Sequence, residues 1–365
     1  MEFLSFGTIL KEQASLVLVG VYTDTITASL VKREEGKTVF ISTATEPQEG
    51  EAFSNGVLDI ERIALNCRKA LSALPHTPGN APHDVVFALG GGIGEFSFMR
   101  EKGVREAKEK KITAEEVAAL VGAHTQGNDK EVARSFAESF HIDGFAVADP
   151  IGLNGSEILI DIVRMACADG FAQSLSHVAS SAGLSMKGFL DMRYAAAKHA
   201  KFFEEAQGSA IVLCIFEHET YAVLVRDRAV AGGGVARAGY GIMIEAIEKT
   251  FFVGREEAKG IMRAFTNKEL DEHTSARIRE ACGVAGKALV ADIAQTVSQL
   301  DPTSLLPGNI RVVSAGEMPQ IDEAFRAPEW LASLPIERNA TVQVWHAPEH
   351  DTGGTAFDVL IAESL

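Results

Sequence analysis

The chain has 365 residues, of which 46% are hydrophobic and 23% are charged, and its formal net charge is −16. This composition is ordinary for a soluble protein with a packed core, and it excludes a disordered or fibrous chain. The acidic balance, with no lysine- or arginine-rich stripe to offset it, argues against nucleic acid as a partner.

Cysteine usage and hydropathy indicate a reducing, cytoplasmic setting. The four cysteines form no CxxC pair and have no histidine at metal-ligand spacing, so we expect buried free thiols and no metal site. No apolar run approaches the roughly 18–20 residues of a membrane span, and the N-terminus lacks a secretory signal. Met1–Leu10 is partly apolar; packing on the protein body is the favoured interpretation, and an interfacial membrane anchor is the alternative.

The first section of the chain combines strand-forming runs with one helix. Strands are predicted at Leu16–Val21, Thr25–Val31, Val39–Thr43 and Asp84–Leu89, and the short polar turn between the first two is typical of a hairpin. Apolar residues at helical spacing predict a helix over Asp59–Leu74, with Asp59 as its N-cap. The order of elements is therefore βββαβ.

A section richer in charge follows, from Gly90 to about Asp161. Thr113 and Glu116 form a capping-box pattern, which predicts that a helix begins after Thr113. Residues 135–142 and 144–148 are predicted as connected strands, or as a strand and a helix. The change in composition indicates a small subdomain inserted into the surrounding fold.

The last section returns to a mixed pattern of helices and strands. Helices are predicted at Phe171–Ala182, at Phe189–Ala206 and from Gly241 to about Leu300, the last with breaks near Gly254, Asn267 and Gly283. Strands are predicted at Ser209–Phe216, Thr220–Arg226, Ile310–Val313, Val342–Trp345 and Ala356–Ile361, with Gly232–Gly234 as a turn. The strand–turn–strand of residues 16–31 thus recurs at 210–226, as in a duplicated unit.

A duplicated βββαβα unit with a cleft between its halves is typical of actin and the sugar kinases. We therefore predict an α/β fold of the actin-like (RNase H-like) type, with two lobes and a small inserted subdomain. The predicted first lobe comprises residues 14–85 and 160–207, and the inserted subdomain comprises 86–159. The second lobe comprises 208–365, with a helical insertion at about 242–305.

Five segments, in the same order along the chain, resemble the bacterial cell-division protein family FtsA. The segments are Phe53–Leu71, Val86–Val117, Ile142–Ile162, Ala238–Ile261 and Ala356–Leu365. The third is the most specific, because Asp143, Gly144, Pro150, Gly152, Gly155 and Leu159 stand where the family pattern has the same residues. The resemblance implies an actin-like membrane adaptor, and PilM of the type IV pilus is a neighbouring relative.

The resemblance places the ATP phosphates between two hairpin turns that are altered in this chain. The family has Asp-x-Gly-Thr in the first turn, where this chain has Gly20, Tyr22 and Thr23, followed by Asp24. In the second turn, the family's Asp-x-Gly-Gly-Gly is replaced by a segment that contains Cys214, Phe216, Glu217 and Glu219. The carboxylates that position the metal and the glycines that admit phosphate are missing, and acidic side chains would repel a polyphosphate.

The adenosine loop of the family, Thr-Gly-Gly-Gly, is reduced here to Ser314, Ala315 and Gly316. We interpret Tyr22, Cys214 and Phe216 as apolar filling of an emptied cleft. An unorthodox cation site built from Asp24, Glu217 and Glu219 is the minor alternative. We therefore expect no catalytic residue and no cofactor, with ATP and Mg²⁺ binding only if the altered pocket retains affinity.

The resemblance also implies partners for this chain. The family uses its inserted subdomain for contacts between neighbouring molecules and with division proteins, which makes Phe96, Phe98, Arg100 and Arg105 candidate surface contacts. We expect self-assembly and binding of FtsZ-like or other division proteins. FtsA reaches the membrane through a C-terminal amphipathic helix that is not recognisable here, so membrane contact would be peripheral, at the inner face. The alternatives are an active or nucleotide-binding ATPase and a PilM-like pilus-assembly adaptor.

Overall fold

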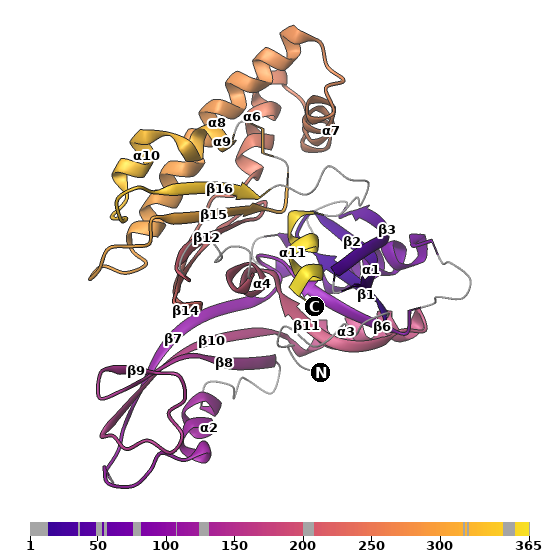
Figure 1. The fold of residues 1–365 in the computed structure, drawn as a ribbon. Coiled ribbons are helices and arrows are strands. Elements are labelled where there is room, and N and C mark those ends of the chain that lie inside the picture. The colour runs from indigo at the N-terminus through magenta and orange to yellow at the C-terminus, as the bar shows by residue number, and fades with distance from the viewer. Residues whose placement is uncertain are drawn as a thin grey trace.

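Two lobes and a smaller third sheet make up the molecule (Figure 1). The computed structural model describes residues 14–364 apart from 36, 49–52, 55–56, 76–81, 107, 124–130, 200–207, 317, 320 and 346–354. The N-terminal segment Met1–Leu10 lies outside the described residues. None of the described helices is long and apolar enough to span a membrane.

The first lobe is built on a five-stranded sheet of order β11-β6-β1-β2-β3. Its strands are β1 (Ser15–Val21), β2 (Thr25–Glu34), β3 (Lys37–Pro47), β6 (Asp84–Leu89) and β11 (Ser185–Asp191). The first three pair in antiparallel fashion, whereas β6 runs parallel to β1 and β11 parallel to β6. Helices α1 (Ile60–Ala73) and α3 (Asp169–Ser181) pack on this sheet, and a short hairpin of β4 (Phe53–Ser54) and β5 (Val57–Leu58) precedes α1.

The second lobe repeats this topology, because its sheet has the order β14-β13-β12-β15-β16. Its strands are β12 (Ala210–Ile215), β13 (Thr220–Arg226), β14 (Ala229–Ala236), β15 (Asn309–Ser314) and β16 (Thr341–Trp345). Again the first three are antiparallel and the last two are added in parallel. Its helices are α6 (Gly241–Phe251), α7 (Arg255–Thr266), α8 (Glu272–Ser298), α9 (Ile321–Arg326) and α10 (Pro328–Ser333). The duplication predicted from the two hairpins is confirmed.

The third sheet has the order β7-β10-β8-β9 and carries helix α2 (Ala114–Gly122). Its strands are β7 (Glu95–Val104), β8 (Glu131–Ile142), β9 (Phe145–Val147) and β10 (Glu157–Ala168). The predicted boundaries at 86 and 159 both cut through strands. The strand β6 belongs to the first lobe, where its buried apolar residues lie between β1 and β11, and β10 stays in the inserted sheet as far as Ala168.

Two predicted helix starts are confirmed by their hydrogen bonds. Asp59 accepts a bond from the backbone nitrogen of Arg62 at 3.0 Å, at the start of α1. At α2, the Thr113 hydroxyl accepts from the nitrogen of Glu116, and the Glu116 carboxylate accepts from the nitrogen of Thr113. Both caps satisfy backbone donors that the first helical turn leaves unpaired.

Three predictions for the second half of the chain are wrong. Residues 189–191 end strand β11, and helix α4 (Met192–Lys198) begins only after Asp191, whose carboxylate caps its first turn; residues 200–206 of the predicted helix lie outside the described residues. Helix α8 continues through Gly283 without a break. Gly232–Gly234 lies inside β14, where a Cβ at Gly234 would come within 2.8 Å of the Thr296 methyl group, so glycine lets α8 pack closely on the strand.

The predicted closing strand at Ala356–Ile361 is also wrong, because these residues form helix α11 (Ala356–Ser364). A reciprocal cap starts it: the nitrogen of Thr355 donates to the Asp358 carboxylate at 2.7 Å, and the nitrogen of Asp358 donates to the Thr355 hydroxyl. The helix packs against β1, β3 and α4 of the first lobe and also contacts β15 of the second lobe. The C-terminal segment therefore holds the two lobes together.

A buried arginine joins the three parts of the molecule. Arg193 of α4 is fully buried, forms an ion pair with Asp191 and donates to the carbonyl oxygen of Gly94 at 2.9 Å. Its guanidinium lies over the ring of Phe96 in the inserted sheet and over that of Tyr221 in the second lobe, at 5.2 and 4.4 Å from the ring centroids. The charge is thus paired and also placed on aromatic faces.

Glu138 of β8 reinforces the same junction. Its buried carboxylate accepts bonds from the Tyr194 hydroxyl at 2.5 Å and from the Lys198 ammonium at 2.8 Å, both on α4. It also accepts from the backbone nitrogen of Val230 in the second lobe at 2.9 Å. The inserted sheet is therefore tied by charged hydrogen bonds to both lobes.

We expect Arg193→Met to lower the free energy of unfolding by about 3–5 kcal/mol, because it leaves the Asp191 charge buried without its partner. Urea unfolding followed by circular dichroism would measure this loss. Arg279→Met, which removes a surface ion pair with Glu272, is the control and should cost less than about 1 kcal/mol. Equal losses in the two variants would contradict a special role for Arg193.

Candidate functional site: the cleft between the lobes

The two turns that correspond to phosphate-binding turns in the resembling family meet between the lobes. Phe216, at the end of β12, lies against the Gly90–Gly91 turn that follows β6, and a Cβ on Gly91 would collide with its ring. The opposite side of the Phe216 ring stacks on Phe357 of α11, with centroids 5.0 Å apart and an interplanar angle of 13°. Aromatic packing therefore fills this end of the cleft.

Tyr22 fills the same end from the first lobe. Its ring is buried, and its hydroxyl donates to the carboxylate of Asp358 at 2.9 Å and contacts the Thr355 hydroxyl. The Thr27 hydroxyl donates to the same carboxylate at 3.0 Å. Gly20 leaves room for the carboxylate, because a Cβ on Gly20 would lie 2.5 Å from Oδ1 of Asp358. A carboxylate of the protein itself thus occupies the space beside β1.

Burial dominates the titration of these groups. Loss of hydration raises the pKa of Asp358, although three donors hold its charged form, and it raises the pKa of Tyr22 well above its usual value. Cys214 lies fully buried in β12, where burial raises the pKa of its thiol and so favours the neutral thiol over the reactive thiolate. Thr23 is buried in the first turn.

A second set of contacts closes the cleft further along. Tyr240, just before α6, donates its hydroxyl to the Asp24 carboxylate at 2.5 Å, which connects the two lobes. The Tyr240 ring lies over Gly316, in the turn after β15 that also contains Ser314 and Ala315. Burial, and then the nearby charge of Glu217, raise the pKa of Asp24.

The two acidic residues of the second turn differ in how their charge is compensated. Glu217 is buried and accepts from Arg255 at 2.7 Å, with the ammonium of Lys259 at 3.7 Å, so two cations already compensate its charge. Glu219 is half-buried, and its Oε1 has no hydrogen-bond partner among the described residues. Within the described part of the chain, no group of three or more His, Cys, Asp or Glu residues is arranged to hold a metal ion. The cation site built from Asp24, Glu217 and Glu219 stays a hypothesis.

An open volume of about 420 Å³ remains between the lobes beyond Tyr240. Asp24, Thr25 and Gln48 line it from the first lobe, and Lys259 and Arg263 of α7 line it from the second. This volume lies within the range of small-molecule sites. The space can admit a small polar molecule, but a polyphosphate would have to displace the aromatic side chains at the other end.

The structure brings most of the predicted cleft residues together, and other residues that the sequence did not indicate join them. Tyr240, Arg255 and Lys259 were not recognised, although the i, i+4 spacing of the two cations puts them on one face of α7. Phe357 and Asp358 were assigned to a strand. The sequence Thr355-Ala-Phe-Asp358 before an apolar run is a capping-box signature that predicts a helix there.

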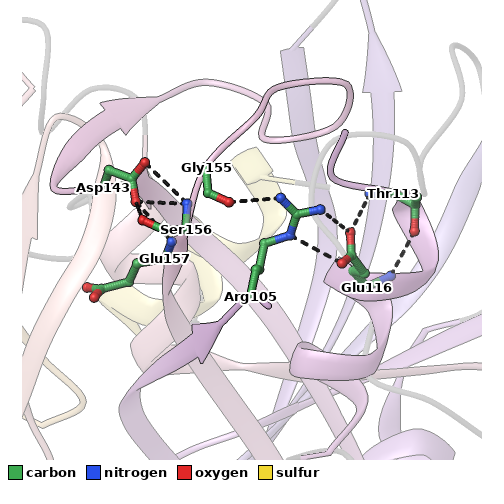
Figure 2. Close-up of polar contacts among 7 residues, drawn as sticks. All are labelled: Arg105, Thr113, Glu116, Asp143, Gly155, Ser156 and Glu157. Carbon is green, nitrogen blue, oxygen red and sulfur yellow. Dashed lines mark hydrogen bonds and ion pairs between the residues drawn. The ribbon is translucent and has the colours of Figure 1, made fainter. Parts of the chain in front are cut away.

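The inserted subdomain uses one of its predicted contact residues for its own structure (Figure 2). The side chain of Arg105 is only 7% exposed, binds the Glu116 carboxylate and donates to the carbonyl oxygen of Gly155 at 2.9 Å. The prediction that Arg105 is a surface contact is therefore wrong. Nearby, Asp143 accepts bonds from the backbone nitrogens of Ser156 and Glu157, which explains the aspartate in this turn. Gly144, the next residue, has a positive φ of 85°, a conformation that favours glycine.

The other three predicted contact residues differ in exposure. Phe96 and Phe98 are half-buried and pack against the core, and Phe96 also lies under Arg193. The Arg100 side chain is 53% exposed but is paired with Asp161 at 2.6 Å. Their binding of a partner stays a prediction. Phe145 of β9, which is 77% exposed, is a better candidate for an intermolecular contact.

Comparison with known proteins gives a structural match without a sequence match. No protein-family model matches the sequence, and no curated protein matches it. The structure resembles that of the "PilM-PilN type IV pilus biogenesis complex", with a TM-score of 0.64, 14% identity, and coverage of 96% of this chain and 98% of that chain. The ethanolamine utilization protein EutJ from Carboxydothermus hydrogenoformans matches with a TM-score of 0.53, 13% identity, and coverage of 98% and 92%.

The chain has the actin-like ATPase fold. The predicted fold class is thereby confirmed. At these levels of identity the match shows the fold alone. The FtsA family itself is not shown by these comparisons.

The raised pKa of Asp24 predicts a pH dependence of stability. A carboxyl whose folded-state pKa is raised binds its proton more tightly in the folded state, so it lowers stability as pH rises above about 4, its unfolded pKa. Asp24→Asn keeps an acceptor for Tyr240 but removes the charge. We expect this variant to be more stable than the parent at neutral pH, with the difference vanishing toward about pH 4.

Thermal unfolding over a pH series would measure this difference. Asp301→Asn is a control of opposite sign, because hydrogen bonds from Ser304 and Thr303 lower the pKa of Asp301. That variant should lose stability at neutral pH and approach the parent only in strong acid. An Asp24→Asn variant that is less stable at neutral pH would show that Asp24 is better paired than its burial indicates.

Proposed function

We propose that the chain is an actin-fold adaptor that binds partner proteins and does not hydrolyse ATP. The observation that carries the proposal is the stack of Phe216 on Phe357 at the phosphate end of the cleft. The C-terminal helix α11 supplies Phe357 and is anchored beside it through Asp358. This end of the cleft is therefore filled by the protein's own side chains, which also join the two lobes.

Phosphoryl chemistry needs groups that this cleft does not offer. A metal ion bridges the phosphates in such reactions, and carboxylates or hydroxyls hold it. Of the nearest carboxylates, Asp358 is bound by Tyr22 and Thr27, Asp24 by Tyr240, and Glu217 by Arg255. A bound polyphosphate would also lie beside these acidic groups, which would repel it.

The first form of the proposal is a PilM-like adaptor, and the similarity to the PilM–PilN complex supports it. That complex belongs to type IV pilus biogenesis, and the likeness extends over 98% of the matched chain in it. A cell-division adaptor that resembles FtsA and binds FtsZ-like partners is the second form of the proposal, supported by the turn motif around Asp143 and Gly155. In both forms the protein works in the cytoplasm, at the inner face of a membrane, and contacts copies of itself.

The open volume beside Lys259 and Arg263 favours one alternative, nucleotide binding without hydrolysis. This part of the cleft is lined by the cations Lys259 and Arg263, by the acids Asp24 and Glu256, and by hydroxyl and apolar side chains beside the Ala315–Gly316 turn. A nucleoside or a monophosphate could occupy it without disturbing Phe216. An active ATPase would require displacement of α11.

We expect Mg-ATP to leave the unfolding temperature unchanged and to undergo no hydrolysis. A ligand at about 100 times its dissociation constant stabilises a protein by about 2.7 kcal/mol, so binding would be visible as a shift of a few degrees. Differential scanning fluorimetry and a phosphate-release assay measure the two effects. Release of phosphate by the protein, but not by Phe216→Asp, would overturn the adaptor proposal in favour of an ATPase.

We expect Phe145→Ser to weaken or abolish capture of at least one partner protein. Phe145 is an exposed aromatic residue on the inserted sheet, so its substitution removes a potential anchor without opening a core cavity. Affinity purification of tagged protein from its native host, with quantitative mass spectrometry, compares the variant with the parent. Leu65→Ser, at a 47% exposed leucine on α1, is the matched control, and an identical partner set for all three proteins would contradict the use of this surface.

A further inference from the structure

The two short helices α9 and α10 lie beside α8 in the second lobe (Figure 1). A groove lies between α8 and these two helices. Its volume is about 680 Å³, and the cleft residues described above take no part in it. From α8 it is lined by Lys287, Ala291, Ala294 and Ser298, and from α10 by Glu329 and Trp330. Alanines on the floor let another helix approach α8 closely.

Trp330 forms a fixed wall of this groove. Its ring packs edge-on against Phe325, with centroids 5.2 Å apart and an interplanar angle of 79°. The residue is more than nine-tenths buried, and its indole nitrogen has no hydrogen-bond acceptor among the described residues. A buried donor without an acceptor is costly to a folded protein.

Exposed apolar residues extend the groove along α8. Val284, which is 68% exposed, precedes Lys287 by three positions and therefore lies on the same side of the helix. Beyond the C-terminal end of α8, Leu305 is 61% exposed, and its neighbour Leu306 pairs with Ile336 just after α10. From Val284 to Ser298, α8 rises by roughly 21 Å, which matches a helix of about four turns.

Charges of opposite sign stand on the two walls. Lys287 lies exposed on α8, and Glu329 lies on α10, and neither forms an ion pair with another described residue. An apolar floor between one cation and one anion is complementary to a helix that has an apolar face bordered by an acid on one side and a base on the other.

We propose that this groove binds an amphipathic α-helix of a partner protein, with an acidic residue facing Lys287 and a basic residue facing Glu329. The inference rests on the proposed adaptor function and names one contact through which it acts. A helix laid in an apolar groove is a recurring mode of peptide recognition, and its apolar residues repeat at every third or fourth position. Such a helix would cover the alanines of α8 and pack against Trp330.

The natural fluorescence of the protein can report occupancy of the groove. The chain contains only two tryptophans, Trp330 and Trp345, so Trp345→Phe leaves Trp330 as the single reporter. The probe is a synthetic helical peptide of about 15 residues with leucines on one face, one glutamate and one lysine on opposite flanks. A peptide of the same composition with its leucines spread around the helix is the control. We expect a saturable change in Trp330 emission with the first peptide only.

Two substitutions of exposed alanines on α8 provide matched variants. Ala291→Arg fills the groove and should weaken binding at least about tenfold, whereas Ala276→Arg lies about four turns away and should change it by less than about twofold. Lys287→Glu should weaken binding of the first peptide and restore binding of a peptide whose glutamate is replaced by lysine. Restoration of this kind requires the two charges to face one another.

Four results would overturn the inference: no saturable emission change, equal binding of both peptides, equal effects of the two arginine substitutions, or absence of the charge-swap rescue. A change in the protein's own sedimentation with Ala291→Arg would assign the groove to a second copy of the chain instead. The Mg-ATP experiment is independent of this one. ATP hydrolysis would overturn the adaptor proposal whatever the peptide does, and failure of the peptide would leave that proposal standing.

Discussion

The C-terminal helix α11 inserts a charged and an aromatic side chain between the two lobes, and the state of the cleft depends on this contact. Asp358 is held by Tyr22 and Thr27 of the first lobe, while Phe357 stacks on Phe216 of the second. In a fold whose two lobes can close around a ligand, these contacts connect them without one. A buried carboxylate with three donors also gives the closed arrangement a defined geometry.

The junction around Arg193 extends this constraint to the inserted sheet. Arg193 and Glu138 lie on different elements, yet both bind groups from two parts of the molecule. Because buried charges need their partners, the three sheets favour one relative arrangement. A scaffold that presents surfaces at fixed relative positions would benefit from this rigidity, and the exposed surfaces at Phe145 and along α8 are both attached to it.

The altered turns, the cleft and the surface features lead to one interpretation. Tyr22 and Phe216 fill one end of the cleft, whereas the second lobe carries an open groove between α8 and α10. The open part of the cleft, around Lys259, is still lined in part by polar side chains. The fold has thus kept its two-lobed architecture while its opportunities for contact lie mostly outside the cleft.

The sequence alone determined the repeated hairpins, the caps at Asp59 and Thr113, and the fold class. These are local signals, since strand periodicity, capping and the residues of a turn act within a few positions of the chain. Only the tertiary structure decided that α11 closes the cleft, that Arg105 is buried, and that Arg193 joins three sheets. Those outcomes depend on contacts between residues up to hundreds of positions apart, such as Tyr22 and Asp358, whose pairing no local pattern specifies.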